Sequence, residues 1–164
     1  MNKVQRREQQ QLISAPIHQL TIFALYMTYT TTDLPKVAAD LLEEYGHQRV
    51  YALLGELGAG KTTLVAEMCR QLGVVTSTSS PTFSIVNQYD GDEGIIYHLD
   101  CYRLDSLEEA IDAGLEELLA EAPSTVFIEW PSVIEAMLPE RTVVLRLNHV
   151  EGGTAREITA EPWG

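Results

Sequence analysis

Blocks of apolar and polar residues along the chain predict alternating strands and helices. Residues 18–30 alternate aromatic or β-branched residues with polar ones, which predicts a strand. In residues 34–45 the apolar side chains recur at helical spacing, with Asp33 placed to cap the helix and Gly46 to end it. The pattern therefore begins with a strand and then a helix.

Two short apolar runs have the pattern of strands that are buried on both faces. They cover residues 50–54 and 125–129. The first leads through a glycine-rich turn into a predicted helix over residues 61–72, which Gly73 ends. Two antiparallel hairpins are also predicted: residues 83–89 pair with 95–99, and residues 143–150 pair with 156–160. The fold class is therefore α/β, with a mixed β-sheet flanked by helices.

The segment after Ser106 predicts one amphipathic helix, because Ser106 and Glu109 fit a capping box. Its inner face would carry Leu107, Ala110, Ile111, Leu115, Leu118 and Leu119. Its outer face would carry Glu108, Glu109, Asp112, Glu116, Glu117 and Glu121. A further short helix is predicted over residues 131–138.

Length and charge limit the classes of protein and partner. The 164 residues suit one domain, expected over 17–164, and the polar, Gln-rich residues 1–16 predict a disordered leader. Eleven Lys and Arg residues against 24 Asp and Glu residues give a formal net charge of −13, which argues against direct tight binding of nucleic acid. No apolar stretch has the length of a membrane span, so we expect a cytoplasmic protein. The isolated Cys69 and Cys101 predict small core residues.

One motif carries recognisable chemistry. Residues 55–62, GELGAGKT, satisfy the pattern G-x-x-x-x-G-K-[ST] between a predicted strand and a predicted helix, and we refer to them as the glycine-rich loop. Backbone N–H groups of such a loop surround a phosphate, Lys61 reaches the outer phosphates, and the Thr62 hydroxyl can ligate Mg²⁺. The alternative is a glycine-rich hairpin with an exposed lysine.

Two acidic residues stand where a Mg-nucleotide would need them. Asp100 and Glu129 each follow an apolar strand, and ligands of α/β sheets bind at the carboxyl ends of the strands. Alternatively, one of the acids caps the following turn or pairs with Arg103. Ser80 and Thr82 are candidates for a switch loop that presents hydroxyls to a γ-phosphate, although such loops are often only connections.

Four segments together resemble the TsaE (YjeE) family, the P-loop ATPase of bacterial tRNA threonylcarbamoyladenosine biosynthesis. They are GELGAGKTT at 55–63, SPTF at 80–83, YHLDCYRL at 97–104 and IEWP at 128–131. The resemblance covers about residues 18–160 and implies a P-loop NTPase-like fold. His98, within the third segment, is interpreted as a strand residue and not as a ligand.

The resemblance also implies roles for single residues. Mg²⁺ would be held by Thr62 and Glu129, Asp100 would serve hydrolysis together with Glu129 as the catalytic acids, and Trp130 would lie near the site. The nucleotide would be bound by Thr31, Leu57, Gly58, Ala59, Gly60, Lys61, Thr62, Thr63 and Gly152.

The implied function is a Mg-dependent ATP-binding and ATP-hydrolysing subunit, with weak hydrolysis on its own. It would support tRNA threonylcarbamoyladenosine modification through TsaB and TsaD partners, and would be a monomer when free. A small-molecule P-loop kinase is one alternative, but no lysine follows Lys61 and the arginines do not cluster as a lid would require. A nucleotide-dependent interaction module without turnover is the other alternative.

Overall fold

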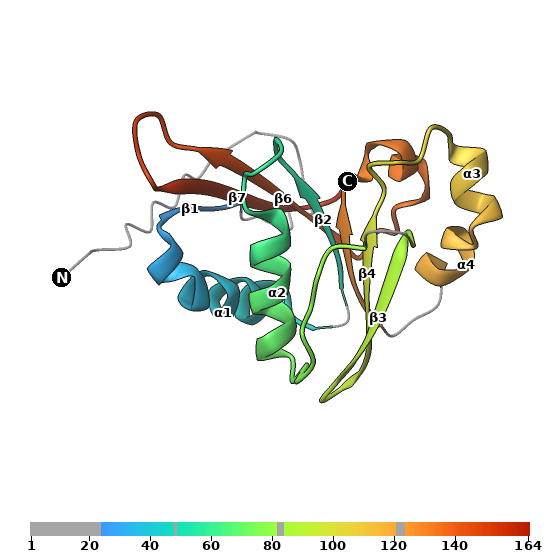
Figure 1. The fold of residues 1–164 in the computed structure, drawn as a ribbon, viewed down its shortest axis with the longest axis horizontal. Helices are drawn as coiled ribbons and strands as arrows, with labels where there is room; N and C mark the ends of the chain where they lie inside the picture. The colour runs from blue at the N-terminus through green and yellow to red at the C-terminus, as the bar shows by residue number, and fades with distance from the viewer. Residues whose placement is uncertain (1–23, 48, 82–83, 121–123) are drawn as a thin grey trace, which may run out of the picture.

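The chain forms an α/β structure in which helices cover both faces of one sheet (Figure 1). The computed structural model describes residues 24–47, 49–81, 84–120 and 124–164. Within these ranges the sheet has seven strands in the order β1-β7-β6-β2-β5-β4-β3. The mixed sheet flanked by helices confirms the predicted fold class.

The strands are β1 Leu25–Tyr29, β2 Val50–Leu54, β3 Val86–Gly91, β4 Gly94–Asp100, β5 Thr125–Glu129, β6 Thr142–His149 and β7 Arg156–Pro162. The helices are α1 Leu34–Tyr45, α2 Lys61–Gln71, α3 Leu107–Asp112 and α4 Leu115–Ala120, with 3₁₀ helices η1 Thr31–Asp33 and η2 Pro131–Met137. Among the described residues, no helix is long and apolar enough to cross a membrane.

Four neighbouring strands, β6, β2, β5 and β4, run parallel, so their carboxyl ends share one edge of the sheet. The register places Asp100 directly beside Glu129. β3 and β7 run antiparallel to their neighbours and form the two predicted hairpins with β4 and β6. Parallel pairing therefore brings the two predicted acids together.

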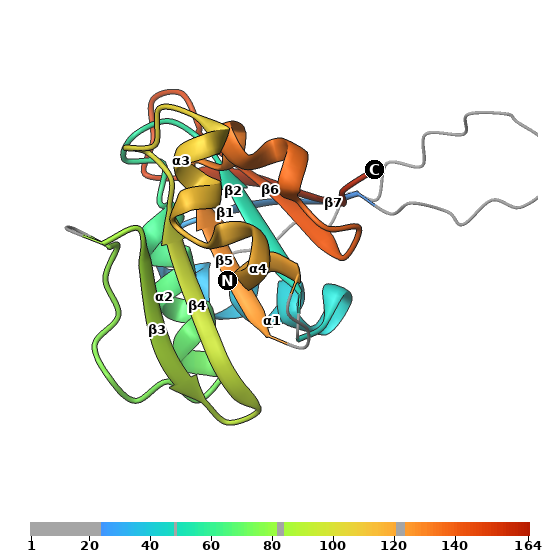
Figure 2. The same ribbon diagram turned by 90° about the vertical axis from the view of Figure 1, so that its right-hand side faces the viewer.

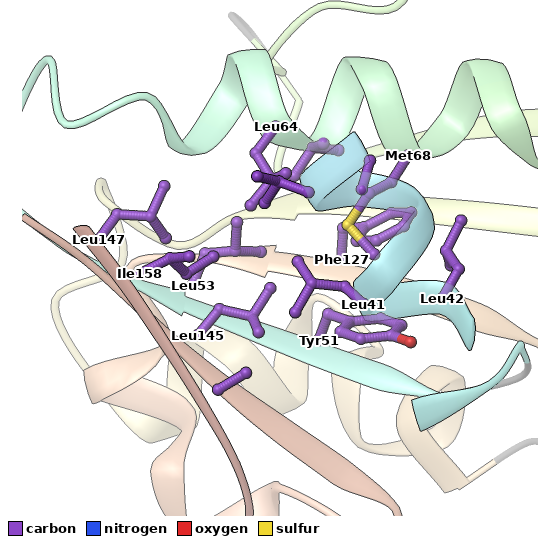
Figure 3. Close-up of a cluster of buried hydrophobic side chains, with 14 of the residues drawn as sticks. Leu41, Leu42, Tyr51, Leu53, Leu64, Met68, Phe127, Leu145, Leu147 and Ile158 are labelled. Atoms are coloured by element: carbon purple, nitrogen blue, oxygen red, sulfur yellow. The ribbon is translucent and has the colours of Figure 1, made fainter. Parts of the chain in front are cut away.

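Two hydrophobic clusters fill the space between helices and sheet. On one face, α1 and α2 pack on fully buried residues such as Tyr51 and Phe127, whose rings stack 5.5 Å apart (Figure 3). On the other face, α3, α4 and η2 pack on Val50, Val126 and Ile128 (Figure 2). The strands between them are buried on both faces, as the uninterrupted apolar runs predict.

Local features correct several predictions. Asp33 is at the N-cap position of α1, as predicted, but its side chain does not cap the helix. Its carboxylate accepts hydrogen bonds from the Thr30 N–H (2.9 Å) and hydroxyl (2.8 Å), because η1 precedes the helix. The single helix predicted after Ser106 is two helices, since Gly114 adopts a positive φ of 76° between α3 and α4. Leu107 and Ile111, predicted on the inner face, are exposed.

Other predictions hold in part. Ser106 caps α3 by accepting the Glu109 N–H at 3.2 Å. The predicted strand over 18–30 is β1 within the described residues, and residues 1–23 lie outside them. Cys69 and Cys101 are buried free thiols, and burial raises the pKa of both to about 12. Both cysteines thus behave as core residues, as predicted.

Candidate functional site

The glycine-rich loop connects β2 to α2 at the carboxyl edge of the sheet. Gly60 lies at φ 102° immediately before α2, a left-handed conformation that favours glycine. At Gly55 a Cβ atom would lie 2.5 Å from the Leu147 carbonyl oxygen, so the loop begins where it packs tightly on β6. Leu57 is 85% exposed, so its side chain projects into solvent.

The first N–H groups of α2 point toward this loop and have no hydrogen-bond acceptor within the helix. Its first hydrogen bond runs from the Leu64 N–H to the Gly60 carbonyl oxygen at 2.9 Å. The N–H groups of Lys61, Thr62 and Thr63 have no acceptor inside the helix, as at any helix N-terminus. In the part of the chain that the structure describes, no side chain caps this end. The arrangement favours an anion.

Lys61 lies buried inside the loop, at 4% exposure. Its Nζ donates to the carbonyl oxygens of Gly55 (2.7 Å) and Glu56 (3.0 Å) and lies 4.0 Å from the centre of the Trp130 ring. Burial lowers the pKa of Lys61, and the nearby Glu129 and Asp100 charges offset this only in part. The ammonium group is thus held by neutral acceptors that a stronger anion can replace.

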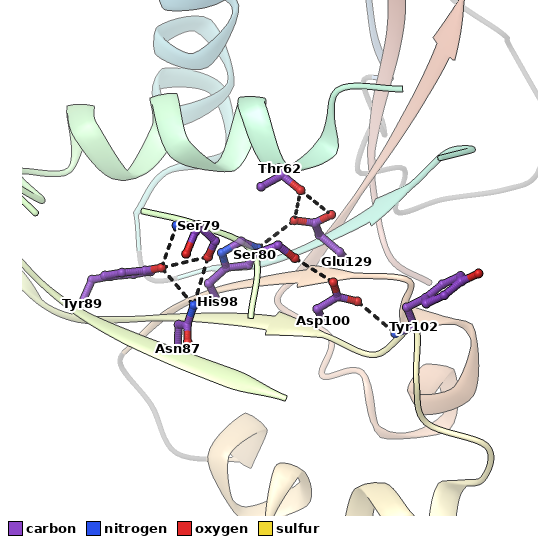
Figure 4. A network of polar contacts seen from close by, with 9 residues as sticks. All are labelled: Thr62, Ser79, Ser80, Asn87, Tyr89, His98, Asp100, Tyr102 and Glu129. Carbon is purple, nitrogen blue, oxygen red and sulfur yellow. Dashed lines mark hydrogen bonds and ion pairs between the residues drawn. The ribbon is translucent and has the colours of Figure 1, made fainter. Parts of the chain in front are cut away.

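Glu129 joins three elements (Figure 4). Its carboxylate accepts a hydrogen bond from the Thr62 hydroxyl, which lies 2.8 Å from Oε1 and 3.0 Å from Oε2. His98 Nε2 lies 2.8 Å from Oε1. Glu129 is only 3% exposed, so α2, β4 and β5 are connected through one buried carboxylate.

Asp100 is bound on both sides. Its Oδ2 accepts from the Ser80 hydroxyl at 2.7 Å, and its Oδ1 accepts from the Tyr102 N–H at 3.0 Å. The second bond caps the turn after β4, so one alternative prediction for this acid is realised. The first brings a predicted switch-loop residue to a predicted acid; Thr82, the other switch-loop candidate, lies outside the described residues.

The Ser80 loop is fixed to β3 by its neighbour Ser79. The Ser79 carbonyl oxygen accepts from the Asn87 amide and the Tyr89 hydroxyl, both at 3.0 Å. The Tyr89 hydroxyl also accepts from the Ser79 N–H at 3.2 Å. β3 therefore determines where Ser80 meets Asp100.

Trp130 follows Glu129 in an uncommon backbone conformation. Its φ of 57° and ψ of 54° are left-handed, which is rare for a bulky residue. This turn places its ring over the Lys61 ammonium and beside the Tyr102 ring, 5.0 Å between centres. Left-handed geometry at such a residue is characteristic of functional sites.

Thr31 and Gly152 lie at the same edge of the sheet. β1 runs antiparallel to β7, and Tyr29 pairs with Arg156, which also pairs with His149 at the end of β6. Thr31 follows β1 and Gly152 lies in the turn after β6, and both are exposed. A Cβ atom on Gly60 would lie 3.9 Å from the Tyr29 hydroxyl, so the end of β1 adjoins the glycine-rich loop.

The donor set beside the loop suits magnesium. A hydroxyl and a carboxylate are the hard oxygen ligands that Mg²⁺ takes from proteins, with phosphates and water completing the shell. Among the described residues, no three His, Cys, Asp or Glu side chains gather as a metal cluster. Thr62 and Glu129 could hold such an ion together with phosphate oxygens.

The contact between His98 and Glu129 is not among the contacts predicted from the sequence. His98 is a strand residue, as interpreted, but it lies on the face of β4 that points toward Glu129. The available signal was its spacing of two residues from Asp100, which places both side chains on one face of the strand.

A family model for the threonylcarbamoyl adenosine biosynthesis protein TsaE matches residues 28–158. The chain belongs to the TsaE family. The tRNA threonylcarbamoyladenosine biosynthesis protein TsaE of Treponema pallidum is 40% identical over 123 residues, covering 75% of this chain and 87% of that protein. The protein of the same description from Borreliella burgdorferi is 36% identical over 111 residues, covering 67% and 80%.

A solved structure also matches the fold. The crystal structure of Bacillus subtilis YdiB superimposes with a TM-score of 0.61 at 26% identity, covering 90% of each chain. The TsaE family takes part in tRNA threonylcarbamoyladenosine biosynthesis. Both the resemblance seen in the sequence and the P-loop NTPase-like fold are confirmed.

Substitution of Gly55, which begins the loop, and of Gly58, at its centre, should lower the stability of the protein by different amounts. Gly55→Ala would meet the Leu147 carbonyl at a φ of 151°, whereas Gly58→Ala would meet nothing within 4 Å at a φ of 80°. We expect Gly58→Ala to lower the free energy of unfolding by about 1 kcal/mol, and Gly55→Ala by about 3 kcal/mol. Urea unfolding measures both, and equal losses would contradict the tight packing of the loop on β6.

Proposed function

We propose that this protein is a Mg-dependent, ATP-binding and ATP-hydrolysing subunit that supports tRNA threonylcarbamoyladenosine modification through partner proteins. The observation that carries the proposal is the contact of Thr62, at the start of α2, with the Glu129 carboxylate at the end of β5. A helix N-terminus with free N–H groups, a buried lysine and two hard oxygen ligands form one site.

The phosphates would lie in the glycine-rich loop. The N–H groups from Leu57 to Thr63 would surround them, and Lys61 would exchange two carbonyl acceptors for phosphate oxygens, a charge-assisted bond of greater strength. Thr31 and Gly152, at the same edge, would contact the rest of the nucleotide. Trp130 would shield the ammonium group from water.

Thr62 and Glu129 would hold the metal, which supplies neutralisation of the phosphate charge that develops during hydrolysis. Asp100 lies beside Glu129 in register, and its bonds to Ser80 and the Tyr102 N–H fix its orientation. A carboxylate in this place can orient and deprotonate an attacking water molecule. Through its hydrogen bond to Asp100, Ser80 would couple the position of its own loop to the orientation of that carboxylate.

The alternatives receive less support. A kinase lid needs several cations over the phosphoryl group. Three of the arginines are engaged elsewhere: Arg70 pairs with Glu67, Arg146 pairs with Glu161, and Arg141 donates to carbonyl oxygens. An interaction module without turnover needs no second acid, so the fixed Asp100 favours hydrolysis. ATP and water are therefore the proposed substrates.

The two acids predict separable defects. Glu129→Ala should reduce by about tenfold or more the factor by which Mg²⁺ tightens ATP binding, because it removes a ligand. Asp100→Ala should keep ATP affinity within about twofold and lower hydrolysis about 100-fold, because a group that acts in the transition state changes turnover alone. Calorimetry measures ATP binding, and phosphate release with partners present measures hydrolysis. Lys61→Ala is the control, because it should lose ATP binding itself. Wild-type hydrolysis in both acid variants would contradict these roles.

The charge distribution predicts how the protein reaches tRNA. Exposed acids cover α3 and α4, namely Glu108, Glu109, Asp112, Glu116 and Glu117; Glu121 lies outside the described residues. With a net charge of −13, the chain should not bind tRNA tightly, and a role in tRNA modification would require other proteins.

We therefore expect no gel shift of tRNA by the purified chain at physiological salt. With TsaB and TsaD we expect a complex in size-exclusion chromatography that requires Mg-ATP, and its association should slow as salt rises, since exposed charges are screened beyond about 8 Å at 0.15 M. Tight tRNA binding by the chain alone, or no nucleotide-dependent complex at any salt, would overturn the proposal.

A further inference from the structure

We infer that His98 is a positioning residue for the metal site: its Nε2–H fixes the Glu129 carboxylate in the orientation that lets it share a cation with Thr62. The inference rests on the proposed function, since the cation accompanies ATP. His98 would touch neither nucleotide nor metal and would act through Glu129 alone.

The geometry of the ring supports a directed role. His98 is 1% exposed, and its Nε2 lies 2.8 Å from Glu129 Oε1. His98 pairs with Phe127 across the two strands, so it lies diagonally from Glu129 on the same face of the sheet. A buried imidazole is costly unless its polar atoms are used.

The other ring nitrogen identifies the tautomer. Among the described residues, His98 Nδ1 is the one buried side-chain nitrogen or oxygen atom without a hydrogen-bond partner. A proton on Nδ1 alone would leave that N–H unpaired and turn the Nε2 lone pair toward a carboxylate oxygen at 2.8 Å. Of the two neutral tautomers, only the one with the proton on Nε2 pairs donor with acceptor.

The shared oxygen explains why this bond matters for a metal ligand. Oε1 of Glu129 lies 2.8 Å from both the His98 nitrogen and the Thr62 hydroxyl oxygen. Thr62 would itself be a ligand of the cation, whereas His98 would not, so His98 is the donor that can hold the carboxylate while the carboxylate ligates the cation. Loss of such outer partners of metal ligands weakens metal binding by about 10-fold to 100-fold.

Three variants test the inference. His98→Phe keeps an aromatic ring of similar size without a donor, and His98→Gln restores an N–H near the position of Nε2. Ile96→Val, in the same strand and also buried, is the control for lost core packing. Calorimetry of ATP with Mg²⁺ and with EDTA gives the factor by which magnesium tightens binding in each protein.

We expect His98→Phe to reduce this magnesium factor at least tenfold while ATP affinity in EDTA stays within about twofold, and His98→Gln to recover most of it. Ile96→Val should leave the factor unchanged although it loses about 1 kcal/mol of stability. A wild-type factor in His98→Phe, or the same loss in Ile96→Val, would overturn the inference. A wild-type protein that binds no ATP would contradict the proposed function instead.

A spectroscopic measurement on the wild-type protein decides the case even where His98→Phe does not fold. Two-bond ¹H–¹⁵N correlation spectra distinguish the imidazole tautomers, and the signal of His98 among the four histidines is assigned by its loss in His98→Gln. We expect the proton on Nε2 and a bare Nδ1. The opposite tautomer would refute the donation to Glu129.

Discussion

The Glu129 carboxylate is the contact on which the whole site depends. It is buried at the end of β5, it accepts a hydrogen bond from Thr62 in the first turn of α2, and its Oε1 lies 2.8 Å from His98 Nε2 on β4. A buried carboxylate without donors would be costly, so these partners stabilise the junction as well as orient it. The glycine-rich loop is thereby held against the sheet at the place where the second acid, Asp100, also ends its strand.

Parallel pairing provides this convergence. Because β2, β4 and β5 run in one direction, the loop after β2 and the acids that end β4 and β5 lie at one edge. The same edge receives the turn after β6 and the end of β1, although β1 is distant in sequence from β7, its neighbour in the sheet. Hydrophobic clusters pack on both faces of the sheet (Figure 3), and the two acids of the site end β4 and β5 (Figure 4).

Much of this arrangement is predictable from the sequence, since the buried strands and the G-x-x-x-x-G-K-[ST] pattern are local signals. The partners of the acids are not local: Ser80 meets Asp100 only because β3 fixes its loop, and His98 meets Glu129 only through strand register. The break between α3 and α4 at Gly114, and the turn before α1 that redirects Asp33, depend on backbone conformations that periodicity does not reveal.

A crystal structure with Mg²⁺ and a non-hydrolysable ATP analogue tests the central claim most directly. We expect phosphates within the glycine-rich loop, a metal ligated by Thr62 Oγ1 and Glu129, and a Lys61 ammonium that has left the Gly55 and Glu56 carbonyls for a phosphate oxygen. A nucleotide bound elsewhere, or a metal held by other side chains while Thr62 still donates to Glu129, would contradict it.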